Sequence, residues 1–286
     1  MEDILGSMGP LVTTEWLAGH IGEYDVVVLD ATLPPVGVAP VVDVRARYLE
    51  AHIPGAMFFD IEALSDPATT LPHMLPTARS FAESMAAMGV GDGSTIVVYE
   101  QEGVFSAPRA WWMLRTFGAR DVYVLDGGLR AWVDEELPTE AFEVRSERAV
   151  FTASYDAAAV RSLAEMKELL RGKGQIVDAR SAGRFAGMAP EPRAGLRSGH
   201  MPGAVSVPFG ELVNAGRMRG SAEIRELFEA KGVDLERPVT TTCGSGVTAA
   251  VLALGLAMCE ATEVSVYDGS WTEYAQRPGA EIVTGA

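Results

Sequence analysis

Cysteine and histidine are scarce in this chain, which has two cysteines and four histidines among 286 residues. Cys243 and Cys259, with fifteen residues between them, match neither a disulfide framework nor the spacing of metal ligands. We therefore expect a reducing compartment and no metal site.

Positive charge is also scarce, since 23 Lys and Arg face 39 Asp and Glu, for a net charge of -16. Nucleic acid and anionic membranes bind broad cationic surfaces, so neither is an expected partner. Residues 1–8 are acidic where signal and transit peptides are basic, and no apolar run is long enough to span a bilayer. We expect a cytoplasmic protein, and 48% hydrophobic residues suffice for real cores.

The chain contains an internal repeat, which decides the expected architecture. Two segments recur at a constant offset of 148 residues, and a third follows after a small slip. The aligned segments are 28–31 with 176–179, 51–56 with 199–204, and 122–128 with 264–270. Three matches in order indicate a duplicated domain.

Each copy alternates short β-branched runs with longer helical patterns. The first copy predicts strands at 26–30, 95–99 and 122–125 and helices at 14–20, 78–88 and 107–117. The second predicts strands at 175–178, 239–242 and 263–267 and helices at 163–170, 222–231 and 247–258. We predict an α/β protein of two tandem domains, each a parallel sheet with helices on both faces. The N-terminal domain is placed at 1–138, a linker at 139–150 and the C-terminal domain at 151–286.

Cys243 lies between a predicted strand and a buried, Ala/Leu-rich helix. Gly244 and Gly246 can adopt positive φ, so that loop N–H groups turn toward the sulfur in front of a helix N-terminus. This arrangement favours a nucleophilic thiolate. Cys259 continues an apolar helix, so we predict that it is a buried structural residue. The matching place in the first copy, residues 99–103, has no cysteine, so only the second copy is expected to carry out thiol chemistry.

The His-x-Pro-Gly-Ala turn occurs in both copies, with His52 and His200. Because it also occurs in the copy without the cysteine, we interpret both histidines as turn residues bonded to the backbone.

Four arginines occur within eighteen residues after the strand at 175–178: Arg180, Arg184, Arg193 and Arg197. They indicate a small anionic substrate, because a guanidinium grips carboxylate oxygens with a planar fork. We expect Arg184 and Arg193 to hold it. The alternative is pairing with nearby carboxylates, which we expect for Arg180 and Arg197.

The class of thiol chemistry is narrowed by the residues after Cys243. Protein tyrosine phosphatases need an arginine six positions after the cysteine, and this chain has Ala249 there. A cysteine protease or acyltransferase with a partner histidine stays open. A tight loop of amides suits a persulfide anion and favours sulfur transfer.

The duplicated unit, the two turns and the cysteine loop together resemble the two-domain rhodanese-like sulfurtransferases over essentially the whole chain. Loop 243–248 is similar to that of the members that use 3-mercaptopyruvate. Thiosulfate-preferring relatives usually carry basic residues after the cysteine, where this chain has Gly244 and Ser245.

The resemblance implies roles for particular residues. Arg184 and Arg193 correspond to the substrate-clamping arginines of the family. Ser245 corresponds to a serine that acts with a histidine, here His73 in a His-Met-Leu-Pro segment, and with an acidic residue. The acidic residue falls on Glu62, where many members have Asp, and Asp60 is a nearby alternative.

The implied activity moves sulfane sulfur from 3-mercaptopyruvate through a Cys243 persulfide to cyanide or to a thiol such as thioredoxin, releasing pyruvate. The loop that cradles the persulfide comprises Gly244, Ser245, Gly246, Val247 and Thr248. No metal or organic cofactor is expected. The alternatives are a thiosulfate:cyanide sulfurtransferase and a non-catalytic persulfide carrier.

Overall fold

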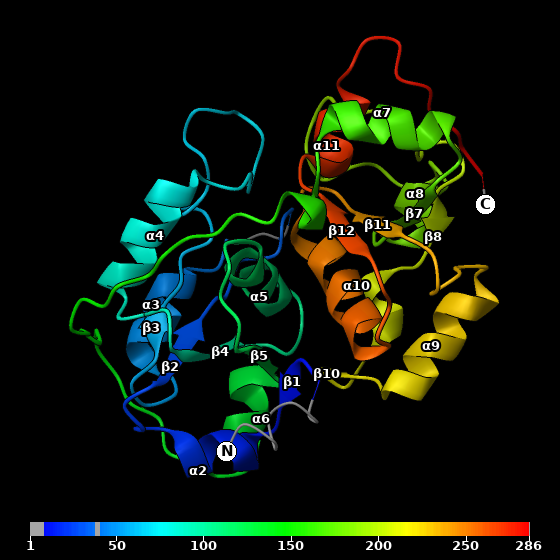
Figure 1. Ribbon diagram of the computed structural model, residues 1–286. Helices are drawn as coiled ribbons and strands as arrows, with labels where there is room; N and C mark the ends of the chain where they lie inside the picture. The colour runs from blue at the N-terminus through cyan, green and yellow to red at the C-terminus, as the bar shows by residue number, and fades with distance from the viewer. Residues whose placement is uncertain (1–8, 38–40, 286) are drawn as a thin grey trace. The chain divides into compact units, whose positions relative to one another are not determined.

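The computed structural model describes residues 9–37 and 41–285, in two compact units (Figure 1). The first unit contains the chain up to Ser65, with Leu75–Asp156 and Ala215–Met218. The second contains Asp66–Met74, Ala157–Asn214 and the chain from Arg219 onward. The predicted domain boundaries follow continuous ranges and stay a prediction. The expectation about a signal peptide concerns residues 1–8, which lie outside the described residues.

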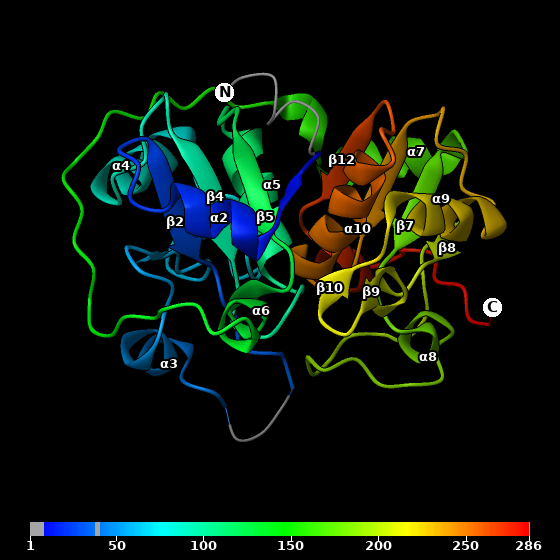
Figure 2. The same cartoon turned by 90° about the horizontal axis from the view of Figure 1, so that it is seen from below.

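A parallel sheet of five strands forms the centre of the first unit, in the order β1-β5-β4-β2-β3. The strands are β1 (Leu11–Val12), β2 (Val26–Asp30), β3 (Met57–Phe58), β4 (Thr95–Tyr99) and β5 (Val122–Leu125). The helices are α2 (Thr14–His20), α3 (Val44–Glu50), α4 (Ala78–Ala87), α5 (Ala107–Thr116) and α6 (Gly128–Asp134). Figure 2 shows α2 across one face of this sheet and α5 on the other.

The second unit repeats this plan with a parallel sheet in the order β6-β12-β11-β7-β8. Its strands are β6 (Val160–Arg161), β7 (Gln175–Asp178), β8 (Val205–Ser206), β11 (Val239–Thr242) and β12 (Val264–Tyr267). Its helices are α7 (Leu163–Arg171), α8 (Ala182–Phe185), α9 (Ser221–Ala230), α10 (Val247–Met258) and α11 (Ser270–Ala275). In Figure 1, α7 and α11 lie on one side of this sheet, and α9 and α10 lie on the other. The 3₁₀ turns η1 (Ala157–Ala159) and η2 (Phe209–Leu212) and the short strands β9 (Val213–Asn214) and β10 (Arg217–Met218) lie in connections.

The predicted α/β architecture is confirmed, with a parallel sheet covered on both faces in each unit. All six predicted strands are present, and they differ from the observed bounds by at most one residue. The structure adds α3, α6, α8 and α11, together with strands of only two residues. The four-residue α8 and the two-residue strands are too short to show a hydrophobic period in the sequence.

Burial on both faces explains why the strands lack polar alternation. Val97 and Tyr99 of β4 belong to a core cluster with Leu17 of α2 and Trp132 of α6. Val98 lies between them in sequence and is also fully buried, on the opposite face, because successive side chains of a strand alternate. The β-branched run is therefore the signature of a central parallel strand.

Both turn histidines are bonded to backbone, as predicted. His52 Nδ1 lies 2.7 Å from the carbonyl oxygen of Tyr48, and His200 Nδ1 lies 2.9 Å from that of Phe185. Each histidine also forms an isolated antiparallel bridge, in the pairs His52 with Glu140 and His200 with Val283. In each unit, the segment after the last helix thus closes over the turn.

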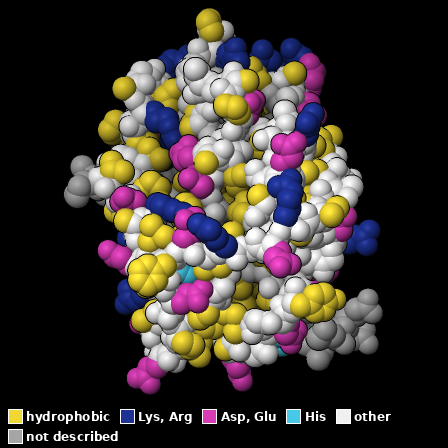
Figure 3. Space-filling model, turned by 90° about the vertical axis from the view of Figure 1, so that its left-hand side faces the viewer, with side chains coloured by type: hydrophobic (Ala, Val, Ile, Leu, Met, Phe, Trp, Pro, Cys, Tyr) yellow, Lys and Arg dark blue, Asp and Glu magenta, His cyan; other side chains and the backbone are white. Residues whose placement is uncertain are grey.

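Charges of both signs are intermixed on the face shown in Figure 3. Hydrophobic side chains show between them, and neither sign forms a broad field over the described residues of this face. In the described part of the chain, the helices are too short or too polar to cross a bilayer.

Glu100 follows β4 at the place where Cys243 follows β11. The strand registers support this correspondence, because Asp30 pairs with Tyr99 as Asp178 pairs with Thr242. The first unit therefore has a carboxylate where the second has a thiol.

The Glu100 carboxylate is buried and is held by the loop that leads into α5. Oε1 accepts the backbone N–H groups of Phe105, Ser106 at 2.8 Å and Ala107 at 3.2 Å. The Ser106 hydroxyl donates to Oε2 at 3.2 Å. Burial raises the pKa of Glu100 to about 7, although these hydrogen bonds oppose the rise. The loop therefore closes around a carboxyl group that the chain itself supplies.

Glu100→Gln tests the cost of this buried carboxyl, because its amide oxygen can still accept the loop N–H groups. The raised pKa means that the wild-type carboxyl lowers the free energy of unfolding as pH rises from 4.5 to about 7. Relative to the wild type, the variant should therefore gain up to roughly 3 kcal/mol between about pH 5 and about pH 8. Urea unfolding at the two pH values measures the change. An equal difference at both would contradict the expectation.

Candidate active site

Cys243 lies at the carboxyl end of β11, directly before the turn into α10. Its side chain is buried, and Sγ accepts the backbone N–H of Gly246 at 3.1 Å. Gly246 has a φ of 82° and caps α10, a conformation that glycine adopts without strain. The sulfur thus lies at the positive end of a twelve-residue helix.

Gly244 differs from the expectation that it would adopt a positive φ, because it is outside the left-handed region. Gly244 matters because it has no side chain. A Cβ at this position would lie 2.9 Å from Nη2 of Arg184 and 4.0 Å from Nη1 of Arg193. The structure therefore brings both predicted arginines to the residue beside Cys243.

The loop after β12 holds the cysteine loop from behind. The Cys243 N–H donates to the Ser270 hydroxyl at 3.2 Å, and the Cys243 carbonyl accepts the Trp271 N–H at 2.9 Å. The Gly244 carbonyl accepts the N–H and the hydroxyl of Thr272. Sequence reasoning missed these three residues.

The internal repeat already singles out Ser270, because it aligns this serine with a glycine of the first copy. It has a φ of 48°, and its counterpart Gly128 in the first unit has a φ of 59°. A serine in the left-handed region is strained where glycine is not. The hydroxyl explains the serine, because it accepts the Cys243 N–H and donates to the Tyr267 carbonyl at 2.8 Å.

His73 and Ser245 lie together in the second unit, as the family resemblance implied. His73 Nδ1 is 3.0 Å from the hydroxyl oxygen of Ser245 and 3.3 Å from its carbonyl oxygen. His73 is buried and has a φ of 62°, in a segment that the Asp66 N–H closes by bonding the Met74 carbonyl. The histidine is therefore held in one strained conformation beside the cysteine loop.

Glu62 and Asp60 are exposed residues of the first unit, in the turn after β3. Asp60 accepts the Ala63 N–H at 3.0 Å and so supports this turn. The assignment of Glu62 as the acidic partner of His73 stays a prediction.

The four arginines divide differently from the expectation. Arg180 is buried and pairs with Asp178 and Glu191, as expected. Burial lowers the pKa of Arg180, but the two carboxylates raise it more. Arg184 also pairs with Glu191, which was the alternative for that residue. The expectation of a carboxylate partner for Arg197 was wrong, since its guanidinium donates to the backbone carbonyls of Ala275, Arg277 and Ala280.

Cys259 is a buried structural residue, as predicted. Its Sγ donates to the Ser221 carbonyl at 3.4 Å, and burial raises the pKa of its thiol. A thiol in this setting is a poor nucleophile.

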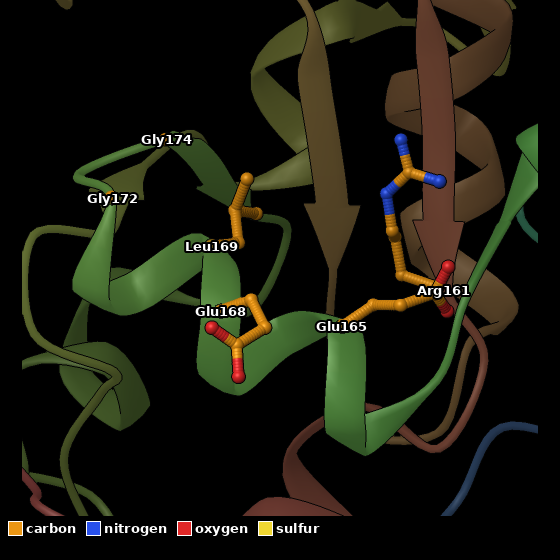
Figure 4. A pocket seen from close by; sticks show the side chains of 6 residues that line it. All are labelled: Arg161, Glu165, Glu168, Leu169, Gly172 and Gly174. Atoms are coloured by element: carbon orange, nitrogen blue, oxygen red, sulfur yellow. The ribbon is translucent and has the colours of Figure 1, made fainter.

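A hollow beside α7 is lined by Arg161, Glu165, Glu168, Leu169, Gly172 and Gly174 (Figure 4). Its charged groups serve local structure. Glu165 completes a capping box with Ser162, and Glu168 pairs with Arg171. Within the described ranges 9–37 and 41–285, no cluster of three or more His, Cys, Asp or Glu is arranged to hold a metal ion.

Both halves of the chain match the rhodanese-like domain family, over residues 13–135 and 162–277. The chain therefore belongs to the rhodanese-like family and contains two of its domains.

Relatives support this assignment along almost the full length. The 3-mercaptopyruvate sulfurtransferase of Escherichia coli K12 is 44% identical over 269 residues, covering 93% of this chain and 95% of that protein. The thiosulfate sulfurtransferase of Bos taurus is 41% identical over 281 residues, covering 95% and 93%. The crystal structure of SseA from Escherichia coli, which has the rhodanese fold, matches with a TM-score of 0.85 and 42% identity, covering 92% and 99%. The chain therefore belongs to the two-domain rhodanese-like sulfurtransferases, which confirms the predicted family, and the protein is an enzyme of sulfur transfer.

Two substitutions of Ser270 separate its hydroxyl from its backbone conformation. Ser270→Ala removes the acceptor of the buried Cys243 N–H and keeps a side chain in the left-handed region, so the free energy of unfolding should fall by about 2 kcal/mol. Ser270→Gly loses the same hydroxyl but relieves the backbone, so its loss should be about 1 kcal/mol smaller. Urea unfolding measures both. A glycine variant less stable than the alanine variant would refute this account.

Proposed function

We propose that this protein transfers sulfane sulfur from 3-mercaptopyruvate through a persulfide on Cys243 to a thiol or cyanide acceptor, with release of pyruvate. The observation that carries the proposal is the arrangement around Gly244. On one side, Cys243 Sγ accepts a loop N–H at a helix N-terminus, and on the other lie the guanidinium groups of Arg184 and Arg193. A nucleophilic sulfur beside two cations suits a small anionic sulfur donor.

The choice of donor rests on the loop after Cys243. Identity does not decide it, because a relative named for 3-mercaptopyruvate and one named for thiosulfate are similarly identical to this chain. 3-Mercaptopyruvate carries a carboxylate and a keto oxygen beside its thiol, and two guanidinium groups can bind both. Gly244 leaves room for Arg184, whereas a Cβ at that position would lie 2.9 Å from Nη2 and the guanidinium would have to shift. Thiosulfate is therefore the weaker candidate, in a thiosulfate:cyanide reaction.

In the first step, the Cys243 thiolate attacks the thiol sulfur of the donor. A sulfur–sulfur bond forms and the carbon–sulfur bond breaks, and its electron pair leaves with carbon as the pyruvate enolate. Arg184 and Arg193 hold the donor's oxygens and stabilise the charge on the enolate. The loop N–H groups from Gly244 to Thr248 stabilise the sulfur that remains on Cys243.

The proton of the donor thiol has to reach the enolate carbon. His73 and Ser245, whose side chains are 3.0 Å apart, form a path for that transfer. Glu62, or Asp60 in its place, is the proposed acidic member of the relay.

In the second step, an acceptor thiolate attacks the outer sulfur and leaves Cys243 as the thiolate again. A reduced thioredoxin or another small cytoplasmic thiol is the proposed acceptor, and cyanide would leave as thiocyanate. The protein itself is proposed to act in the cytoplasm, without a metal or an organic cofactor. A non-catalytic persulfide carrier would need a donor protein to load Cys243.

Cys243→Ser tests the persulfide step, because an alkoxide cannot replace a thiolate here. Pyruvate release from 3-mercaptopyruvate should fall by at least about a thousandfold. Cys259→Ser is the matched control and should keep its activity. Mass spectrometry of the wild type after incubation with 3-mercaptopyruvate alone should show the addition of one sulfur atom. Substantial activity in the Cys243 variant would end the proposal, and an unmodified wild type would favour the carrier.

Gly244→Ala tests the need for space beside Arg184. The new Cβ should displace the guanidinium, so that KM for 3-mercaptopyruvate rises about tenfold with a smaller change in kcat. Gly210→Ala in the same unit is the control, because a Cβ there meets no atom within 4 Å. Steady-state kinetics with 3-mercaptopyruvate and with thiosulfate measure the effect. An unchanged KM would place the donor's carboxylate elsewhere.

A further inference from the structure

A chain of alternating charges runs from the end of β7 to the cysteine loop of the second unit. Asp178 pairs with Arg180, and Arg180 Nη1 donates to Glu191 Oε1 at 2.8 Å. Glu191 Oε2 in turn accepts Nε of Arg184 at 3.1 Å. Glu191 is thus the carboxylate that joins a buried arginine to an arginine at the site.

The buried end of this chain is fixed. The Arg180 side chain has no exposed surface, and its guanidinium lies 4.2 Å from the centre of the Trp271 ring. Nη2 also donates to the Gly199 carbonyl at 2.8 Å. Because Arg180 is held by these contacts, it fixes one oxygen of Glu191, whose side chain is only 1% exposed although it comes from a loop.

The other end of the chain would be mobile without Glu191. The Arg184 side chain is 23% exposed, and an arginine has several rotatable bonds. Glu191 binds both Nε and Nη2 of Arg184 through Oε2. This side-on contact sets the plane of the guanidinium and leaves Nη2 against Gly244.

We propose that Glu191 is a positioning residue, which fixes Arg184 beside Cys243 so that the guanidinium meets the carboxylate of an incoming donor. This inference rests on the proposed function for the identity of the donor, but the geometry concerns any small carboxylate that reaches Cys243. Glu191 acts through Arg184 and does not touch the donor itself.

The direction in which Glu191→Gln changes the affinity for an anion distinguishes positioning from simple electrostatics. Glu191→Gln removes a negative charge close to Cys243, and charge alone would then strengthen the attraction of an anion. Loss of positioning has the opposite result, because Arg184 is released from the loop. The two explanations therefore predict changes in opposite directions.

The test compares the rates at which iodoacetate and iodoacetamide alkylate Cys243. The reagents differ by a carboxylate, so their rate ratio reports how well a cation near Cys243 receives it. The ratio should fall about tenfold in Glu191→Gln, which corresponds to the loss of one charge-assisted interaction. KM for 3-mercaptopyruvate should rise by a similar factor, with a smaller effect on kcat.

Asp178→Asn is the matched control. Like Glu191→Gln, it removes one carboxylate from the buried Arg180, but the contact between Glu191 and Arg184 remains. Its ratio should stay close to that of the wild type. Glu191→Asp keeps the charge that the buried Arg180 needs, so it should fold even if the glutamine variant does not, and its shorter side chain should give an intermediate ratio.

A double-mutant cycle with Arg184→Ala completes the test. If Glu191 acts through Arg184, Glu191→Gln should add little once Arg184 is absent. A raised or unchanged ratio in Glu191→Gln, additive effects, or an equal fall in Asp178→Asn would each overturn the proposal. A wild type without any preference for iodoacetate would do the same. Failure to turn over 3-mercaptopyruvate, with the ratio responding as expected, would refute the proposed donor and leave the positioning role intact.

Discussion

An ionisable side chain at the buried end of a central strand must be met by N–H groups, and both units of this protein are organised around that requirement. In each, a parallel sheet is covered by helices on both faces, so the strand end has little access to water. The residues around the N-cap of the next helix supply the N–H groups. In the second unit the Gly246 N–H meets the sulfur of Cys243. In the first unit the N–H groups of Phe105, Ser106 and Ala107 meet the carboxylate of Glu100. The same scaffold thus holds the thiol of Cys243 in one copy and the carboxyl group of Glu100 in the other.

The position of Arg184 beside the cysteine loop depends on two other factors, which are the charges around it and the space beside Gly244. Arg180 and Glu191 are almost fully buried, and each is stable there because it is paired with opposite charge on more than one side. Because Glu191 also binds Arg184, the pairing limits the movement of that guanidinium. The absence of a side chain at Gly244 then lets this guanidinium come close to the loop. Glu191 thus orients the guanidinium of Arg184, in a segment whose four arginines predict only a cationic site.

Much of this could be predicted from sequence, and the remainder has identifiable physical causes. The strands around β4 and β11 were evident because burial on both faces gives continuous β-branched runs. Cys243 was evident because glycines interrupt the pattern between a strand and a helix. Ser270 was missed because its role depends on a backbone N–H twenty-seven residues away. The partner of Arg184 was left open because several carboxylates lie nearby in sequence, and only folding selects Glu191.

The segment Asp66–Met74 has a consequence for how the molecule is made. It precedes Leu75–Asp156 in the chain, yet it belongs to the second unit, where His73 lies against Ser245. During synthesis this segment leaves the ribosome long before its partner exists. Its contact with Ser245 can form only after the cysteine loop has been made, so a chain that ends before residue 243 has no His73–Ser245 pair.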